Sequence, residues 1–202
     1  MPDAGVPMEP SRRTITLTDP RALRAYAHPT RMRLVGLLRH QGPFTATTAA
    51  ELTGESVASC SYHLRMLAKY GLVEEAGGGQ GREKPWRATA TYTEWPDHSD
   101  DPAVTEAATA LGTAVAERYF ERMTKAIESR HLLSEQWQEA ESFGDTMLYL
   151  TPEELVRVRH EMNAVLAPYE DRNNDASLRP EESRPVEFLR IAFVRRESTE
   201  RS

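Results

Sequence analysis

Residues 47–71, TTAAELTGESVASCSYHLRMLAKYG, decide the fold of this 202-residue chain. A short helical segment at residues 47–52 is broken by Gly54. A longer helix is expected over residues 56–70, with Gly71 at its C-terminal cap. A short helix, a glycine turn and a longer helix in this order predict a helix-turn-helix.

A β-hairpin is expected directly after the second helix. Leu72 and Val73 begin an extended segment, and residues 85–90 can return as its partner strand. Glycines at positions 77, 78, 79 and 81 predict a flexible tip between them. This hairpin would be the wing of a winged helix-turn-helix.

Two helices are expected before the helix-turn-helix. Asp19 and Pro20 suit the N-cap and first position of a short helix that ends at Pro29. Thr30 can cap the next helix, which ends before Gly42. Its apolar stripe is the expected centre of the core and consists of Leu34, Leu37 and Leu38.

The second half of the chain regains helical spacing after a stretch rich in Pro, Asp and Ser at residues 95–102. Apolar residues recur from Val104 to Ile127 and predict one long amphipathic helix. Thr151 and Glu154 match a capping box that opens another helix, which Pro168 is expected to end. Residues 186–194, rich in branched and aromatic side chains, are expected to form a late strand.

These patterns predict a mainly helical, α+β protein with four parts. Residues 1–18 would be a flexible arm, and residues 19–95 a winged helix-turn-helix. Residues 100–195 would be a helical dimerisation or effector region, followed by a flexible tail at residues 196–202. The apolar face of the long helix needs a partner, which favours a homodimer.

Charge is divided unevenly along the chain. Residues 1–95 hold 12 Lys and Arg against 9 Asp and Glu, a net charge of +3, and residues 96–202 hold 13 against 22, a net charge of −9. A mildly basic module on an acidic body is compatible with binding to nucleic acid. The chain has no apolar run long enough for a membrane and no secretion signal, and its one cysteine suits a reducing compartment. We therefore expect a cytoplasmic protein, associated with the nucleoid.

The expected helix over residues 56–70 has two faces. Four residues are expected to point into the core: Val57, Cys60, Leu64 and Leu67. The opposite face carries Ser59, Ser61, Tyr62 and Arg65. Short hydroxyl groups and a phenol near the start of such a helix suit contact with base edges, whereas Arg65 and Lys69 suit phosphates. A polar helix surface with no partner is the alternative interpretation.

Three cations surround the expected glycine-rich tip of the wing. They are Arg82, Lys84 and Arg87. Glycines would allow these side chains to reach a groove or the phosphate backbone. A solvated charged turn is the alternative.

Three stretches, AHPTRMRLVGLL, AAELTGESVASCSYHLRMLAKYGLVEE and GREKPWRA, resemble the ArsR-like winged-helix family of bacterial regulators over about residues 19–90. The resemblance implies a homodimer on an inverted repeat of double-stranded DNA. It also implies contacts from the SYHL helix and the wing cations, and the helix contributes Ser59, Ser61, Tyr62, His63 and Arg65. The long second half departs from the small single-domain members and looks like the larger actinobacterial branch.

Neither a metal site nor a catalytic centre is expected. Metal sensors of this family need cysteine pairs or sets of histidines and carboxylates, whereas Cys60 is alone and Glu128 with His131 is a single pair. His160 begins a zinc-protease pattern, but position 164 is alanine. We expect no cofactor and no enzymatic activity. Four aromatic residues could line a small-molecule effector pocket or be plain core: Tyr119, Trp137, Phe143 and Tyr149.

The sequence thus favours a homodimeric, sequence-specific transcriptional regulator that binds double-stranded DNA, with no membrane association. The alternative is a winged-helix module that binds proteins and does not read DNA sequence.

Overall fold

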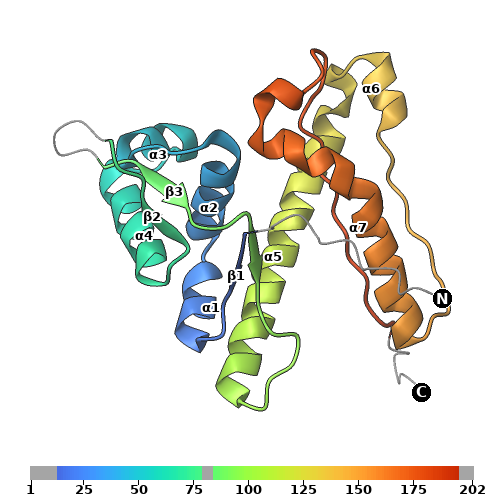
Figure 1. The fold of residues 1–202 in the computed structure, drawn as a ribbon, viewed down its shortest axis with the longest axis horizontal. Coiled ribbons are helices and arrows are strands. Elements are labelled where there is room, and N and C mark those ends of the chain that lie inside the picture. The colour runs from blue at the N-terminus through green and yellow to red at the C-terminus, as the bar shows by residue number, and fades with distance from the viewer. Residues whose placement is uncertain (1–12, 79–83, 196–202) are drawn as a thin grey trace, which may run out of the picture. The chain divides into compact units, whose positions relative to one another are not determined.

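The computed structural model of the chain describes residues 13–78 and 84–195. The chain forms two compact units, residues 1–128 and residues 129–202 (Figure 1). The boundary therefore lies about 30 residues later than the composition of residues 95–102 suggests. The reason is that the first turns of the long helix α5 (Pro102–Ser129) pack into the N-terminal core, where Val104, Ala107 and Leu111 are buried.

The N-terminal unit contains the four helices and the hairpin of a winged helix-turn-helix in the expected order, together with two strands that the sequence pattern does not predict. In chain order the elements of this unit are β1 (Thr14–Thr16), α1 (Pro20–Tyr26), α2 (Pro29–Gln41), α3 (Ala46–Thr53), α4 (Val57–Lys69), β2 (Val73–Glu75), β3 (Trp86–Ala88), β4 (Tyr92–Glu94) and α5. Side-chain caps fix the helix starts: Asp19 accepts from the backbone of Arg21, and Ser56 accepts from the backbone of Ser59. Gly54 ends α3 with a φ of 76°, a left-handed conformation that favours glycine.

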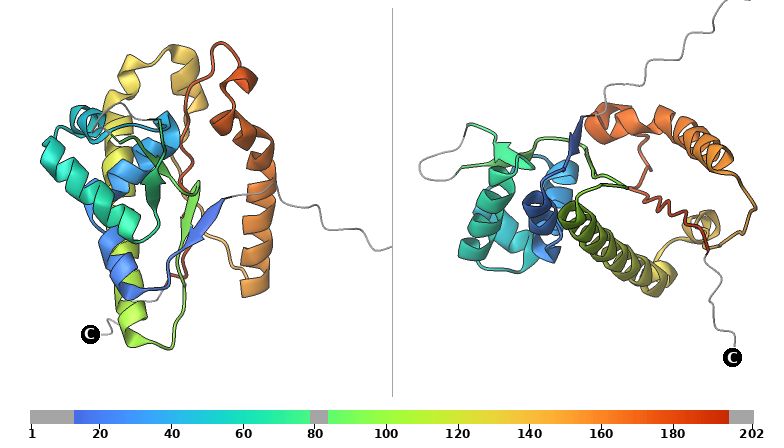
Figure 2. Two further views of the ribbon diagram at one scale, coloured as in Figure 1. Left: turned by 60° about the vertical axis from the view of Figure 1, so that its left-hand side comes forward. Right: turned by 90° about the horizontal axis from the view of Figure 1, so that it is seen from below.

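Residues 14–18 belong to the fold, so the expectation of a flexible arm over the first 18 residues is wrong for this part. β1 pairs in parallel with β4, with Thr14 opposite Tyr92 and Thr16 opposite Glu94 (Figure 2). The backbone N–H of Leu17 donates to the carbonyl of Glu94 at 2.8 Å, and the Leu17 side chain is buried. Burial of this leucine stabilises a segment whose polar composition alone predicts disorder.

The wing is the antiparallel pair β2 and β3, with Val73 opposite Ala88 and Glu75 opposite Trp86. Phe44, in the loop before α3, extends this pair on the other side of Trp86. The two residues exchange backbone hydrogen bonds of 3.1 and 2.8 Å. The base of the wing is therefore fixed to the start of the helix-turn-helix.

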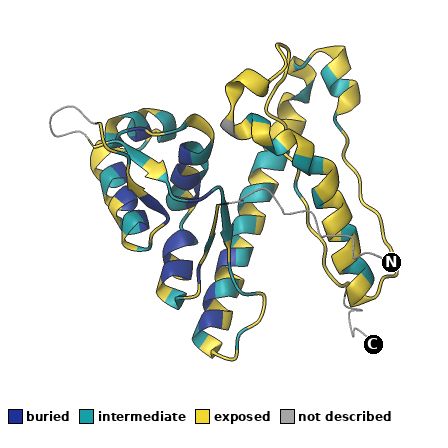
Figure 3. Ribbon diagram, in the orientation of Figure 1, coloured by how far each residue is buried: buried dark blue, intermediate teal, exposed yellow. Residues whose placement is uncertain are grey.

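One hydrophobic core lies between the helices and strands of the N-terminal unit (Figure 3). Its largest fully buried side chains include Leu23, Leu34, Leu64, Leu67, Leu72 and Leu111. Each of these leucines comes from a different element or a different turn. Their burial, worth about 1.5–3 kcal/mol apiece before entropy costs, holds the elements together.

The C-terminal unit is built from short and long helices. They are η1 (Arg130–Leu132), α6 (Glu135–Ala140), α7 (Pro152–Asn174) and η2 (Ala176–Leu178). The expected capping box is present, because Thr151 accepts from the backbone of Glu154 at 3.2 Å and Glu154 accepts from the backbone of Thr151 at 2.9 Å. The expectation that Pro168 ends this helix is wrong. Proline removes one hydrogen bond, and the carbonyl it frees belongs to Ala164, which is exposed and can be hydrated.

The expected late strand is absent from the described residues, where 186–194 form no paired strand. A strand is stable only beside a second strand that accepts and donates its backbone hydrogen bonds. A composition rich in β-forming residues does not provide that second strand. Burial gives a related result: among the described residues, none after Leu111 is buried (Figure 3). The C-terminal unit thus has the one helix that the sequence predicts there, α7, together with three short helices that it does not predict, and no buried residue in its described part.

Candidate nucleic-acid interface

Helix α4 has one face in the core and one face outside. Cys60, Leu64 and Leu67 have no exposed area, as the helical spacing predicts. Val57 is 46% exposed, so the expectation that it points inward is wrong. It is the first residue of α4 and lies one turn before the part of the helix that packs on the core.

The outer face of α4 presents Tyr62 and Arg65. Tyr62 is 52% exposed, and its ring meets the ring of His63 edge-on at 5.3 Å. The Arg65 Nη1 donates to the Ser61 hydroxyl at 2.9 Å. These two residues are one helical turn apart and are joined by this hydrogen bond. Lys69, near the C-terminal end, lies over the Tyr70 ring at 5.5 Å. Tyr62 and Arg65 can reach a ligand without disturbing the core.

Ser59 is hydrogen-bonded to Glu55, which lies in the turn between α3 and α4. Its hydroxyl donates to Glu55 Oε2 at 2.5 Å. Thr30, at the start of α2, donates to the other carboxylate oxygen, also at 2.5 Å. The two hydrogen bonds, first that from Ser59, hold the pKa of Glu55 below its usual value. Glu55 therefore ties the first turn of α4 to the first turn of α2 and fixes the angle of α4.

His63 is buried, which corrects its expected place among the contact residues. Only 8% of its surface is exposed. Its ring contacts the ring of His28 with 4.6 Å between centroids, and its Nε2 lies 4.0 Å from Glu55 Oε2. His63 points toward the start of α2 because it neighbours the buried Leu64 and follows the buried Cys60 by one turn.

Burial lowers the pKa of both histidines below the usual imidazole value, and the positive charge of Arg31 acts in the same direction. The Glu55 carboxylate opposes this shift without reversing it. Nδ1 of each ring is buried and has no hydrogen-bond partner in the described part of the chain. The lowered pKa values favour the neutral form of both rings at neutral pH.

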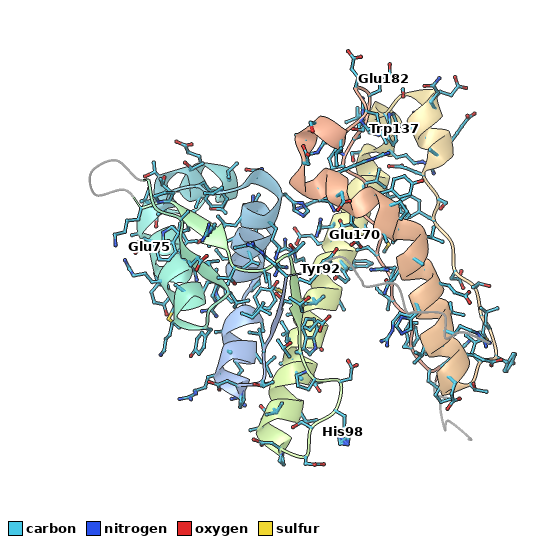
Figure 4. The ribbon with its side chains drawn as sticks, viewed as in Figure 1. Glu75, Tyr92, His98, Trp137, Glu170 and Glu182 are labelled. Atoms are coloured by element: carbon cyan, nitrogen blue, oxygen red, sulfur yellow. The ribbon has the colours of Figure 1, made fainter. Side chains whose placement is uncertain are left out.

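The wing cations that the structure describes are paired with glutamates of the neighbouring strand. Lys84 Nζ lies 2.8 Å from Glu75 Oε2, and Arg87 Nε lies 2.8 Å from Glu74 Oε1. Figure 4 labels Glu75 on the wing. Arg82 lies outside the described residues. Exposed ion pairs of this kind contribute about 0–1 kcal/mol, so a phosphate can take the place of the glutamate.

Arg33 and Arg39 are positioning residues that the sequence pattern did not single out. Arg33 of α2 donates to the carbonyls of Leu52 and Thr53 at 2.7 and 2.9 Å and so holds the end of α3. Arg39 donates to the carbonyl of Ala90 at 2.9 Å and to the Thr93 hydroxyl at 2.7 Å. The atoms that accept these hydrogen bonds belong to residues about 20 to 54 positions away in the sequence. The spacing of residues along one helix cannot reveal such contacts.

Missed as well were Glu55 and His28. Thr30 was expected to cap α2, but His28 holds the N-cap position and Thr30 hydrogen-bonds to Glu55 instead. Glu55 precedes Ser59 by four residues, and this spacing is a usable signal for a hydrogen bond within the first turn of a helix. The contact between His28 and His63 joins positions 35 residues apart and has no such signal.

Within residues 13–78 and 84–195, no group of three or more His, Cys, Asp or Glu side chains is placed to hold a metal ion. Cys60 is buried near Thr53, with 3.4 Å between Sγ and Oγ1. A hollow of about 400 Å³ in the C-terminal unit includes Trp137 and Glu182 in its lining. Phe143, Tyr149 and Tyr119 do not line it. No helix of the described ranges is both long and apolar enough to cross a membrane.

Residues 26–76 match a family described as a helix-turn-helix domain. Curated proteins include no significant match to the chain. One similar solved structure is the homodimeric winged helix-turn-helix DNA-binding domain, fragment 1–100, of a possible ArsR-family transcriptional regulator from Mycobacterium bovis. It is 18% identical over 62% of this chain and 85% of that chain, with a TM-score of 0.31, so the fold assignment rests on the observed elements and the family match. The N-terminal unit is therefore a winged helix-turn-helix domain, on its own elements and on the helix-turn-helix family match.

Proposed function

We propose that this chain is a transcriptional regulator that binds a specific site on double-stranded DNA as a homodimer on an inverted repeat. The observation that carries the proposal is the two-faced helix α4. Its inner leucines are fully buried, and its outer face exposes Tyr62 and Arg65. A helix anchored in this way can enter the major groove, which is about 12 Å wide, and keep its outer side chains against base edges.

The contacts and exposure of each side chain suggest which part of the DNA it binds. Tyr62 reads base edges, because it is exposed and its hydroxyl can donate or accept. Arg65, Lys69, Lys84 and Arg87 bind phosphates, with Ser59 and Ser61 supporting the helix surface. A dimer on its operator would block or recruit polymerase, and the C-terminal unit would receive the controlling event, including a small-molecule effector.

A module that binds proteins instead of DNA is the second candidate. Lys84 and Arg87 form ion pairs with Glu75 and Glu74. These pairs neutralise charge and weaken the positive electrostatic potential of the wing. Val57 and Tyr62 also give the outer face of α4 apolar area, which suits a protein partner.

Binding to random duplex DNA separates the two candidates. For a DNA regulator, fluorescence anisotropy should give an affinity that falls linearly with the logarithm of salt concentration between about 50 and 200 mM. Arg65→Ala should reduce the salt slope by about one, and Arg159→Ala, on the exposed surface of α7, should leave it unchanged. Selection from a random pool should then enrich an inverted repeat. No binding at 50 mM salt, or enrichment of no sequence, would contradict the proposal.

A further inference from the structure

The C-terminal unit ends in a segment that belongs to neither a helix nor a strand. In residues 186–195 the structure has no helix and no paired strand. Phe188, Ile191 and Phe193 in this segment are 65%, 63% and 80% exposed. A segment rich in β-forming residues that lies in no sheet of the described chain can serve as a template for pairing with another strand.

The unit that carries this segment also lacks a core. From residue 129 onward no described residue is buried, although Leu132, Val165 and Phe193 have large apolar side chains. A folded unit of this size normally buries most of the apolar area that its chain offers. The C-terminal unit is thus incomplete in one copy of the chain, and covering its apolar residues requires a partner.

The sequence of the segment is complementary to itself in one antiparallel register. With Ile191 opposite Ile191, Glu187 faces Arg195 at both ends of the pair. In the same register Phe188 faces Val194 and Leu189 faces Phe193, each twice. Opposite charges and aromatic residues against branched or aromatic ones are the cross-strand pairs that stabilise sheets.

Neighbouring registers lose this match. Moving the two-fold axis to Arg190 places Arg190 opposite itself and Glu187 opposite Phe193. Moving the axis to Ala192 places Leu189 opposite Arg195 and so removes the pair of Glu187 with Arg195. Like charges directly opposite each other destabilise a strand pair. The charges therefore select one register among those that the apolar residues would accept.

We propose that residues 187–195 pair antiparallel with the same residues of a second copy of this chain, on a two-fold axis at Ile191. The inference rests on the homodimer of the proposed function and names the surface that forms it. Arg190 hydrogen-bonds to Asn163 of α7, so the segment is held along that helix in its own unit. Opposite Arg190 the register places Ala192, whose small side chain leaves this contact in place.

A disulfide at the axis tests the register. Residues directly opposite in an antiparallel pair have Cα atoms about 4.5–5.5 Å apart, within the range of about 4.4–6.8 Å that a disulfide spans. Ile191→Cys in the full-length protein should therefore form a cross-linked dimer under mild oxidation. Cys60 has no exposed area, so the unmodified protein should remain uncross-linked.

The matched control is Val194→Cys, which is 82% exposed. In the proposed register its two copies lie about 20 Å apart, six residues along the strand, and cannot be bridged. We expect at least tenfold slower cross-linking than at Ile191. Equal cross-linking at both positions, which a parallel pair or random collision would give, overturns the proposal, as does no cross-linking at Ile191.

A charge exchange tests the same pair without cysteine. Glu187→Arg and Arg195→Glu should each raise the dimer dissociation constant about two- to thirtyfold, because each dimer holds two such pairs. The double variant, with the charges exchanged, should return to within about threefold of the original value in sedimentation. A double variant no better than the single ones overturns the proposal.

These outcomes are independent of DNA binding. Cross-linking at Ile191 by a chain that does not bind duplex DNA would refute the proposed function and leave the strand pair intact. Dimeric binding to an inverted repeat with no cross-linking at Ile191 would refute the strand pair alone.

Discussion

Tyr62 is the exposed side chain on α4 that best separates reading of sequence from general attachment to DNA. If its ring and hydroxyl lie over base edges, Tyr62→Ala should cost about 1–3 kcal/mol on the selected operator. Binding to random duplex should change little, because the phosphate contacts remain. Anisotropy on both duplexes measures the difference.

Folding of the Tyr62→Ala variant must be checked by thermal circular dichroism. A residue that is 52% exposed should leave the melting temperature nearly unchanged, whereas Leu64→Ala, fully buried, should cost about 2–5 kcal/mol of stability. A folded Tyr62→Ala protein with unchanged operator affinity would show that another residue reads the bases.

If Lys84 binds phosphate as proposed, Glu75 competes with DNA for it. The pair is exposed and 2.8 Å long, so its net contribution is about 0.2–1 kcal/mol. Glu75→Gln should therefore raise the affinity for random duplex by about two- to fivefold, through both the freed lysine and the lost negative charge. Glu94→Gln, at the exposed last residue of β4, is the control for charge alone. An equal gain from both variants would show that Lys84 does not bind phosphate.

Among the elements, α5 begins after the stretch that suggests a domain boundary, yet its first turns pack in the N-terminal core. Leu111 has no exposed area and lies in the N-terminal core, whereas Ile127 is 52% exposed. Leu111→Ala should lower the free energy of unfolding by about 2–5 kcal/mol. Ile127→Ala should stay within about 0.5 kcal/mol. Urea denaturation gives both values, and similar costs at the two positions would contradict this placement of α5.

Helices whose ends carry local signals could be predicted from sequence. Ser56 caps α4, Gly54 ends α3 and Thr151 opens α7, because each makes its hydrogen bonds within a few residues. Elements that depend on distant partners could not be predicted. β1 exists because residues 92–94 lie beside it, and the expected strand at residues 186–194 has no neighbour in the described chain.

The candidate site divides in the same way. Helical spacing identifies Cys60, Leu64 and Leu67 as buried and Tyr62 and Arg65 as exposed. It cannot show that His63 turns toward His28, because that contact depends on how α2 crosses α4. Nor can spacing along the wing show that Lys84 and Arg87 are paired across the two strands.

For the whole molecule, the neutral histidine pair predicts how stability depends on pH. The pKa of His28 and of His63 is lower in the folded protein than the usual value of about 6.5, so below that pH the unfolded chain binds more protons. This contribution to stability is complete above pH 6.5 and is lost as the pH falls toward the folded pKa values. Glu55, whose pKa is also lowered, adds a further loss below about pH 4.5.

The urea midpoint should therefore fall between pH 7 and pH 5.5, before the carboxylates titrate. In His28→Gln/His63→Gln the midpoint should fall less over this interval, whatever its absolute value. His131→Gln, on an exposed histidine, should leave the pH dependence as it is. A double variant with the original pH dependence would show that other groups control it.

The backbone bridge between Phe44 and Trp86 also fixes an intrinsic fluorophore, the Trp86 indole, at the base of the wing. Trp86 is half-buried at the base of the wing, and its indole emission will respond to any ligand that docks there. The chain's other two tryptophans, Trp95 and Trp137, can be replaced by phenylalanine without touching this bridge. Fluorescence quenching of Trp86 would then follow the proposed binding of DNA to the wing in real time, with no dye on either molecule.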